Sequence, residues 1–76
     1  LSGSLSTDSD FSDSNLQGAD LSGADLSRAD LVRCNLRDAN LAHADFEHAD
    51  LTAADLRGAN VEGTRFSGAQ MERVLR

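Results

Sequence analysis

Residues 19–58 read ADLSG ADLSR ADLVR CNLRD ANLAH ADFEH ADLTA ADLRG, which is one five-residue pattern repeated eight times without a gap. Each unit has a small residue in first position, Asp or Asn in second and a large apolar residue in third. The fourth and fifth positions vary. Repetition at a fixed short period is typical of solenoids, in which each unit stacks on its neighbours.

The pattern extends in both directions from this stretch and covers residues 9–71. The second position is Asp or Asn in eleven of thirteen units, and the exceptions are Arg65 and Gln70. The third position, which we expect to form the core, is apolar throughout: Phe11, Leu16, Leu21, Leu26, Leu31, Leu36, Leu41, Phe46, Leu51, Leu56, Val61, Phe66 and Met71. The first position is also expected to point inward, and in ten units it is Ala19, Ala24, Ala29, Cys34, Ala39, Ala44, Ala49, Ala54, Ala59 or Ala69.

Neither a helix nor a continuous strand accommodates this period. Five residues advance about 500° around an α-helix, so successive third-position residues would step by about 140° and scatter around its axis. On a continuous strand an odd period would place alternate units on opposite faces. A chain that bends after every five residues fits the pattern, because its first and third positions then share the inner face. Asp, Asn, Ser and Gly suit the corners that such bends require.

The motif A-[DN]-L-x-x over residues 9–71 resembles that of the pentapeptide-repeat family. The resemblance implies an all-β fold, a right-handed quadrilateral β-helix (β-solenoid) with four units per turn and about three coils. Each residue would stack on the residue twenty positions earlier, which predicts that Phe66 stacks on Phe46 inside an otherwise aliphatic tube. At about 4.8 Å per coil, the tube would be about 15 Å tall.

The two ends of the chain depart from the pattern. Residues 1–8 have weak register, and we expect an irregular N-terminal segment or a tag remnant there. In residues 72–76, Val74 and Leu75 follow Met71 at i+3 and i+4, which predicts a short helical cap or a tail. A cover is expected because an open coil end presents unpaired backbone and apolar side chains, and an uncovered end favours self-association.

The charge of the chain follows largely from its repeat. The formal net charge is −6, from 13 acids against 7 arginines with no lysine, which argues against nonspecific nucleic-acid binding and favours solubility or a basic partner. However, seven of the acids occupy the second position: Asp10, Asp20, Asp25, Asp30, Asp45, Asp50 and Asp55. The remainder of the chain is close to neutral, so the acidity is not by itself a functional surface. No apolar run approaches the roughly 18 residues of a membrane helix.

Few residues are candidates for chemistry. Cys34 occupies a first position, so we expect a packed core thiol, which is a poor nucleophile. His43 and His48, with Glu47 between them and Asp45 nearby, contain ligand types that bind Zn²⁺. Because fifth positions on successive sides diverge around a corner, we expect solvated surface residues instead of a metal site. We therefore predict no catalytic residues, no metal, no cofactor and no enzymatic activity.

Arginine is the surface feature that the repeat does not require. Stacking by twenty places Arg57 on Arg37, and it places Arg33 and Arg73 in one column at the adjoining corner. The four side chains form a candidate basic patch suited to carboxylate or phosphate groups. The alternative is that scattered arginines pair with nearby aspartates.

The leading functional hypothesis is a non-catalytic protein-interaction or structural scaffold module that forms one part of a larger protein, and its partner is another protein or another domain of the same chain. One alternative, implied by the family resemblance, is a mimic of DNA that binds DNA gyrase, as in antibiotic-resistance members. A second alternative is a truncated or designed model solenoid. No membrane or direct nucleic-acid binding is expected; no targeting signal is visible, and a cytoplasmic location is favoured.

Overall fold

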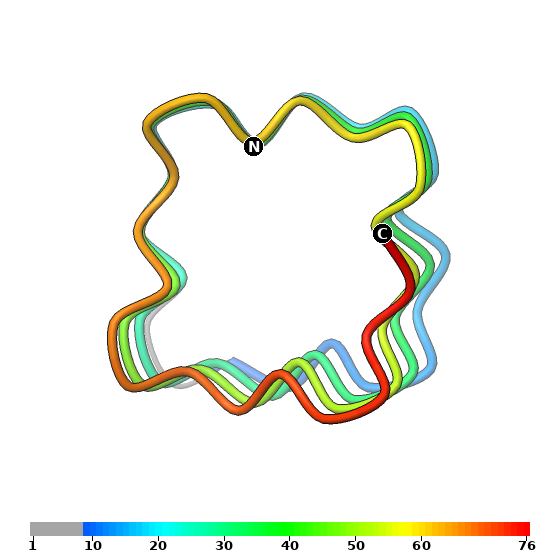
Figure 1. The fold of residues 1–76 in the computed structure, drawn as a ribbon, viewed down its shortest axis with the longest axis vertical. Helices are drawn as coiled ribbons and strands as arrows, with labels where there is room; N and C mark the ends of the chain where they lie inside the picture. The colour runs from blue at the N-terminus through cyan, green and yellow to red at the C-terminus, as the bar shows by residue number, and fades with distance from the viewer. Residues whose placement is uncertain (1–8) are drawn as a thin grey trace.

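The chain winds into a four-sided tube, which the computed structural model describes over residues 9–76 (Figure 1). Seen down the tube, the path runs counterclockwise and approaches the viewer from its blue N-terminal coil to its red C-terminal coil. This sense makes the solenoid right-handed. The segment expected to be irregular or a tag remnant, residues 1–8, lies outside the described residues.

Consecutive coils are in register by twenty residues, as the family resemblance implies. Parallel bridges join the second-position residue of each unit to the one twenty positions later, from Asp10 with Asp30 to Asp55 with Leu75. Five-residue sides and this register give four sides per coil, so the described residues form slightly more than three coils. The molecule measures 26 × 23 × 19 Å, and the shortest dimension lies along the tube.

Residues 9–76 contain neither a helix nor a strand of more than one paired residue, so there are no element bounds beyond the five-residue sides. The all-β expectation therefore holds for the pairing between coils but not for extended strands. The reason is that the chain turns at every fourth and fifth position. In this part of the chain there is also no helix long and apolar enough to cross a membrane.

Each corner is a tight turn with a left-handed residue in fifth position. The N–H of Ala24, for example, donates to the C=O of Leu21 at 3.0 Å, and Gly23 between them has φ of 68°. A positive φ at the third residue of such a turn is typical of type II turns and favours glycine. Eight fifth-position residues that are not glycine nevertheless adopt the same positive φ: Asp13, Arg28, Arg33, Asp38, His43, His48, Ala53 and Arg73.

The second-position side chains stabilise these turns. In each case Oδ1 accepts a hydrogen bond from the backbone N–H two residues later, as Asp50 does from Thr52 at 3.1 Å. This Asx geometry explains why the position is restricted to Asp and Asn. It occurs at Asp10, Asn15, Asp20, Asp25, Asp30, Asn35, Asn40, Asp45, Asp50, Asp55 and Asn60.

The first and third positions fill the tube. Third-position side chains from Leu21 to Leu56 are buried together with the first-position residues between them. The ring of Phe66 stacks on that of Phe46, which confirms the predicted aromatic pair. The ends of the predicted core are different, since Phe11, Leu16, Phe66 and Met71 are only partly buried. Val61 is 45% exposed, so its assignment to the core was wrong, because no further coil of the described chain covers it.

The predicted helical cap is also wrong. Residues 72–76 continue the repeat, because the coil beneath offers ladder partners that a helical turn would forfeit. Arg73 has φ of 60° and Val74 N–H donates to Met71 C=O at 3.2 Å, which forms a corner like the others. Leu75 pairs with Asp55 and is 48% exposed.

Candidate functional site

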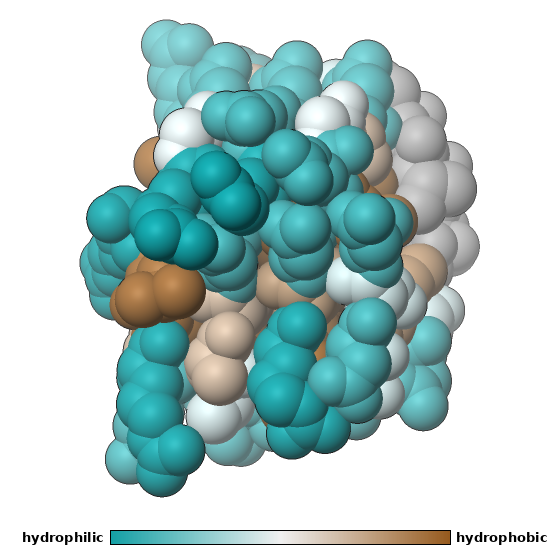
Figure 2. All heavy atoms as spheres, turned by 90° about the vertical axis from the view of Figure 1, so that its right-hand side faces the viewer, coloured by the Kyte–Doolittle hydropathy of each residue, from teal (hydrophilic) through white to brown (hydrophobic). Residues whose placement is uncertain are grey.

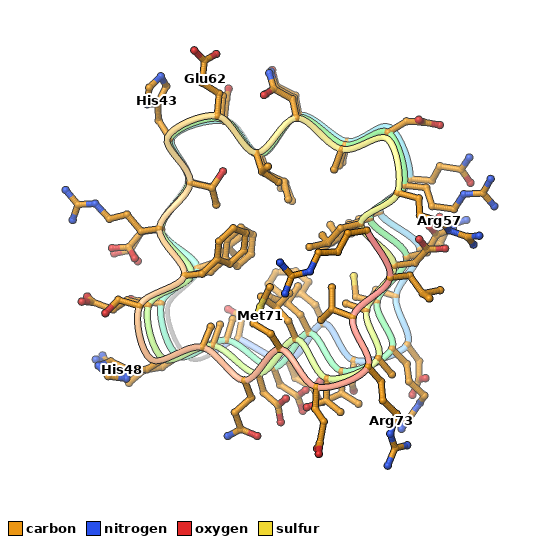
Figure 3. All side chains as sticks on the ribbon, in the orientation of Figure 1. His43, His48, Arg57, Glu62, Met71 and Arg73 are labelled. Carbon is orange, nitrogen blue, oxygen red and sulfur yellow. The ribbon has the colours of Figure 1, made fainter. Side chains whose placement is uncertain are left out.

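The four candidate arginines lie at the two corners that bound one side of the solenoid. We call this side, which carries residues 14–18, 34–38, 54–58 and 74–76, the arginine face. Arg57 lies at its upper corner and Arg73 at its lower corner (Figure 3), and the register places Arg37 with Arg57 and Arg33 with Arg73. Figure 2 views this side of the molecule, which is largely hydrophilic. Hydrophobic atoms show near its left edge, which is the C-terminal end of the tube.

Two of these arginines are neutralised by aspartates. Arg33 pairs with Asp13 through Nε–Oδ1 at 2.7 Å and through a second contact at 3.0 Å. Arg57 pairs with Asp55 through contacts of 2.9 and 2.7 Å. The hydrogen bond from Arg57 lowers the pKa of Asp55 to about 2, and that from Arg33 lowers the pKa of Asp13. Both pairs are at the surface, where such contacts contribute little stability.

The other two arginines have no carboxylate within ion-pair distance among residues 9–76. Arg37 lies one coil below Arg57, and the N–H of the adjacent Asp38 donates to the C=O of Arg57 at 3.0 Å. Arg73 is two coils from Arg33, with Ala53 between them. The structure therefore brings Arg37 and Arg57 together at one corner and separates Arg33 from Arg73 at the other.

The two histidines lie at different corners, both outside the arginine face (Figure 3). Each imidazole lies beside the glycine of the next coil, since a Cβ placed on Gly63 or Gly68 would be 2.5 Å from Nδ1 of His43 or His48. Within the described chain, no three or more His, Cys, Asp or Glu side chains cluster as a metal site would require.

Cys34 is a core thiol, as predicted. It is buried in the wall between Leu31 and Leu36, and burial raises the pKa of the thiol to about 11. A neutral, inaccessible thiol is a poor nucleophile.

The repeat aspartates do not form a single acidic surface. They lie on all four sides of the tube, and each serves as the acceptor of an Asx turn. The hydrogen bonds that Ser12 and Ser22 donate lower the pKa values of Asp10 and Asp20. Both carboxylates are thus engaged in local structure while remaining charged at neutral pH.

A hollow within the last described coil is the feature that sequence reasoning missed. The C-terminal coil surrounds a hollow of about 200 Å³, lined among others by Leu56, Val61, Phe66 and Arg76. Because a helical cap was expected over residues 72–76, this hollow was not predicted. A signal was nevertheless present, because Arg76 stands five residues after Met71, in the third position that is apolar in every unit from Phe11 to Met71.

Three solved structures share this architecture. A pentapeptide repeat protein of the Arabidopsis thaliana thylakoid lumen is 29% identical, with a TM-score of 0.93 over 96% of this chain and 50% of that one. HetL of the cyanobacterium Nostoc sp. strain PCC 7120, involved in the regulation of heterocyst differentiation, is 30% identical, with a TM-score of 0.59 over 99% and 46%. Another pentapeptide repeat protein from Nostoc PCC 7120 is 40% identical, with a TM-score of 0.51 over 88% and 60%.

These matches and the repeat itself agree on one family. The chain spans about half the length of the first two solved proteins and 60% of the third. A search of curated protein sequences gives no significant match. The family model for pentapeptide repeats (8 copies) matches residues 7–41 and 29–68. The five-residue period, the Asx corners and these matches establish that the chain belongs to the pentapeptide repeat family.

Proposed function

We propose that this chain is a non-catalytic protein-binding module that uses the arginine face to bind an anionic segment of another protein. The observation that carries the proposal is Arg37, a guanidinium without a carboxylate partner among residues 9–76, directly beneath Arg57. Arginine offers a planar set of donors that matches carboxylate and phosphate groups. Arg73, also without an ion-pair partner in this part of the chain, adds a second available donor at the other corner of the face.

The interior of the tube favours binding over catalysis. Enzymes place converging polar groups in a concave pocket. Here the described interior consists of Leu, Ala, Phe and one neutral thiol, and no polar or charged residue of residues 9–76 is buried. The regular flat sides of a solenoid are better suited to contact an extended partner.

The test compares two variants of equal net charge. Arg37→Ser with Arg73→Ser removes the two guanidinium groups of the arginine face that are unpaired within residues 9–76, whereas Arg28→Ser with Arg65→Ser removes two arginines from the opposite side, whatever their contacts. Proteins captured from native lysate by each form are identified and quantified by mass spectrometry. We expect the first variant to lose specific acidic or phosphorylated partners that the second retains. Identical capture by both variants would contradict the proposal.

The same experiment addresses the DNA-mimic alternative. A mimic presents carboxylates along one surface in place of phosphates, but the repeat aspartates here are distributed around all four sides. Selective capture of DNA gyrase, with inhibition of its supercoiling activity by the purified protein, would favour that alternative over the arginine face.

A further inference from the structure

Two units of residues 9–76 carry arginine in fourth position, and both lie on the arginine face. Arg37 and Arg57 therefore occupy the same place in the repeat, one coil apart. Their turns also have the same geometry, since each N–H donates to Oδ1 of the second-position residue of its own unit at 3.1 Å. That residue is Asn35 beside Arg37 and Asp55 beside Arg57. The two units thus compare Asn with Asp at one position of the same face.

Asp55 neutralises Arg57 through an atom that Asn35 lacks. Its Oδ1 accepts a hydrogen bond from Nε at 2.9 Å, and its Oδ2 accepts another from Nη2 at 2.7 Å. In Asn35 the place of Oδ2 is taken by an NH2 group, which donates and cannot accept from a guanidinium. That group instead contacts Oδ1 of Asn15 and Oε1 of Gln17 in the preceding coil, at 3.3 and 3.4 Å. Asn35 therefore completes its turn without supplying a carboxylate to its own unit.

The fold does not require asparagine at residue 35. Either Asn or Asp accepts the hydrogen bond of an Asx turn, and both do so elsewhere in this chain. Stacked aspartates are also compatible with the register, because Asp30 and Asp50 are joined by a bridge in the same way as Asn35 and Asp55. The contacts of the Asn35 amide with the preceding coil are long and exposed, so they add little stability. What asparagine changes at this position is the state of Arg37.

The site around Arg37 lies within the body of the solenoid. Fourth-position residues flank Arg37 in both neighbouring coils, Gln17 before it and Arg57 after it. The carboxylate of Asp38, which follows Arg37, lies against the next coil and is not within ion-pair distance of any arginine of residues 9–76. The pKa of Asp55 is lowered chiefly by the hydrogen bond from Arg57 and also by the charge of Arg37. The guanidinium of Arg37 thus lies beside an ion pair in which it takes no part.

We infer that Asn35 is the specificity-determining residue of the arginine face, because it leaves Arg37 available for a carboxylate of the partner. The inference rests on the function proposed above and deepens it by naming the group that is bound. Arg57 shows how an arginine in this position holds a carboxylate, with Nε and Nη2 each donating to one oxygen. This bidentate form is the one in which arginine recognises planar anions. Because Asp55 already occupies Arg57, an Asp or Glu side chain of the partner binds Arg37.

An acidic probe and one substitution test this role. Hexaglutamate is titrated into the isotope-labelled 76-residue protein at about 0.05 M salt, where screening is moderate, and the Nε–Hε resonances of the arginines are followed by NMR. In Asn35→Asp, we expect the resonance of Arg37 to move toward that of the paired Arg57 and the affinity for hexaglutamate to fall about fivefold. Asn40→Asp makes the same charge change in a unit with Ala42 in fourth position, so it should leave both unchanged.

An exchange of the two second-position residues provides the positive control. Asn35→Asp with Asp55→Asn keeps the net charge and both Asx acceptors, but it pairs Arg37 and releases Arg57. We expect hexaglutamate to bind with near wild-type affinity and the responding resonance to be that of Arg57 in place of Arg37. The melting temperature should stay close to that of the wild type. A merely structural role for Asn35 would not transfer the response from one arginine to the other.

The failure of this inference is distinguishable from the failure of the proposed function. An Arg37 resonance that Asn35→Asp leaves unchanged, or equal weakening of binding by Asn40→Asp, would overturn the role of Asn35 even where the wild-type protein binds hexaglutamate. Binding that the exchange variant does not restore would overturn it as well. A wild-type protein that binds hexaglutamate no better than Arg37→Ser would instead overturn the proposed function, and the assignment of Arg37 with it.

Discussion

The ring of Phe66 lies over the ring of Phe46, with centroids 5.6 Å apart and planes inclined by 8°. Phe46 is fully buried in the middle of the tube, whereas Phe66 lies in the last described coil and is only partly buried. Substitution of Phe46 therefore tests the stability of the core, whereas substitution of Phe66 tests that of the last coil.

Phe46→Leu should cost about 1–2 kcal/mol of unfolding free energy, and Phe66→Leu about half as much, because Phe66 is only partly buried. Leucine occupies the same position elsewhere in the repeat, so both variants should fold. The double variant should reveal a coupling of ~0.5–1.5 kcal/mol in urea unfolding. Phe46→Leu with Met71→Leu, in a different column, serves as the additive control, and equal coupling in both pairs would contradict direct stacking.

Two glycines with the same backbone geometry should respond differently to alanine. Gly18 and Gly58 have φ of 73° and 76°, so either substitution imposes strain of about 1 kcal/mol. A Cβ on Gly18 meets nothing within 4 Å, whereas one on Gly58 collides with the carboxylate of Asp38. Thermal unfolding should therefore show a greater loss for Gly58→Ala, and Asp38→Ser should restore part of it. Equal losses would show that only φ matters.

Acid should weaken the Arg57–Asp55 contact over a defined range of pH. The pKa of Asp55 is lowered from 3.8 to about 2, so its contribution is complete above pH 3.8 and is lost as the pH falls toward 2. NMR titration should show the Asp55 carboxyl protonating well below an ordinary aspartate. In Arg57→Ser, that midpoint should move up toward 3.8, and an unchanged midpoint would exclude Arg57 as the cause.

Cys34 should be unreactive in the folded protein. Its burial and raised pKa, about 11, leave it a neutral thiol at pH 8. A disulfide reagent such as DTNB should react at a rate limited by unfolding, and the reaction should become immediate in urea. Cys34→Ala, which matches the other units, should change stability by less than about 1.5 kcal/mol. Rapid labelling of the native protein would indicate that this wall opens locally.

The fold was predictable because a period of five leaves few alternatives. The phase of Leu21, Leu26 and Leu31 excludes a helix, and register by twenty then follows from four sides. The handedness and the four units per turn came from the family resemblance rather than from the residues. The cap was mispredicted because Met71, Val74 and Leu75 satisfy both a helical spacing and the repeat, and only the ladder partners of the coil beneath decide between them.

The surface was less predictable than the core. The sequence places Arg33, Arg37, Arg57 and Arg73 on two columns, but it does not determine which guanidinium groups find carboxylates. Arg33 reaches Asp13 one coil below, while Arg57 turns to Asp55 on its own side. Such choices depend on side-chain rotamers at each corner, which a periodic pattern leaves unspecified.

The register by twenty also separates two kinds of sequence change. Deleting one pentapeptide keeps every later leucine inside the tube, yet it rotates everything that follows by a quarter turn. Deleting four units preserves both the interior and the alignment of the faces. A surface assembled from several coils, such as the arginine face, is therefore destroyed by a change that the fold itself tolerates. Only the gain or loss of whole coils conserves both the packing of the interior and the alignment of the faces.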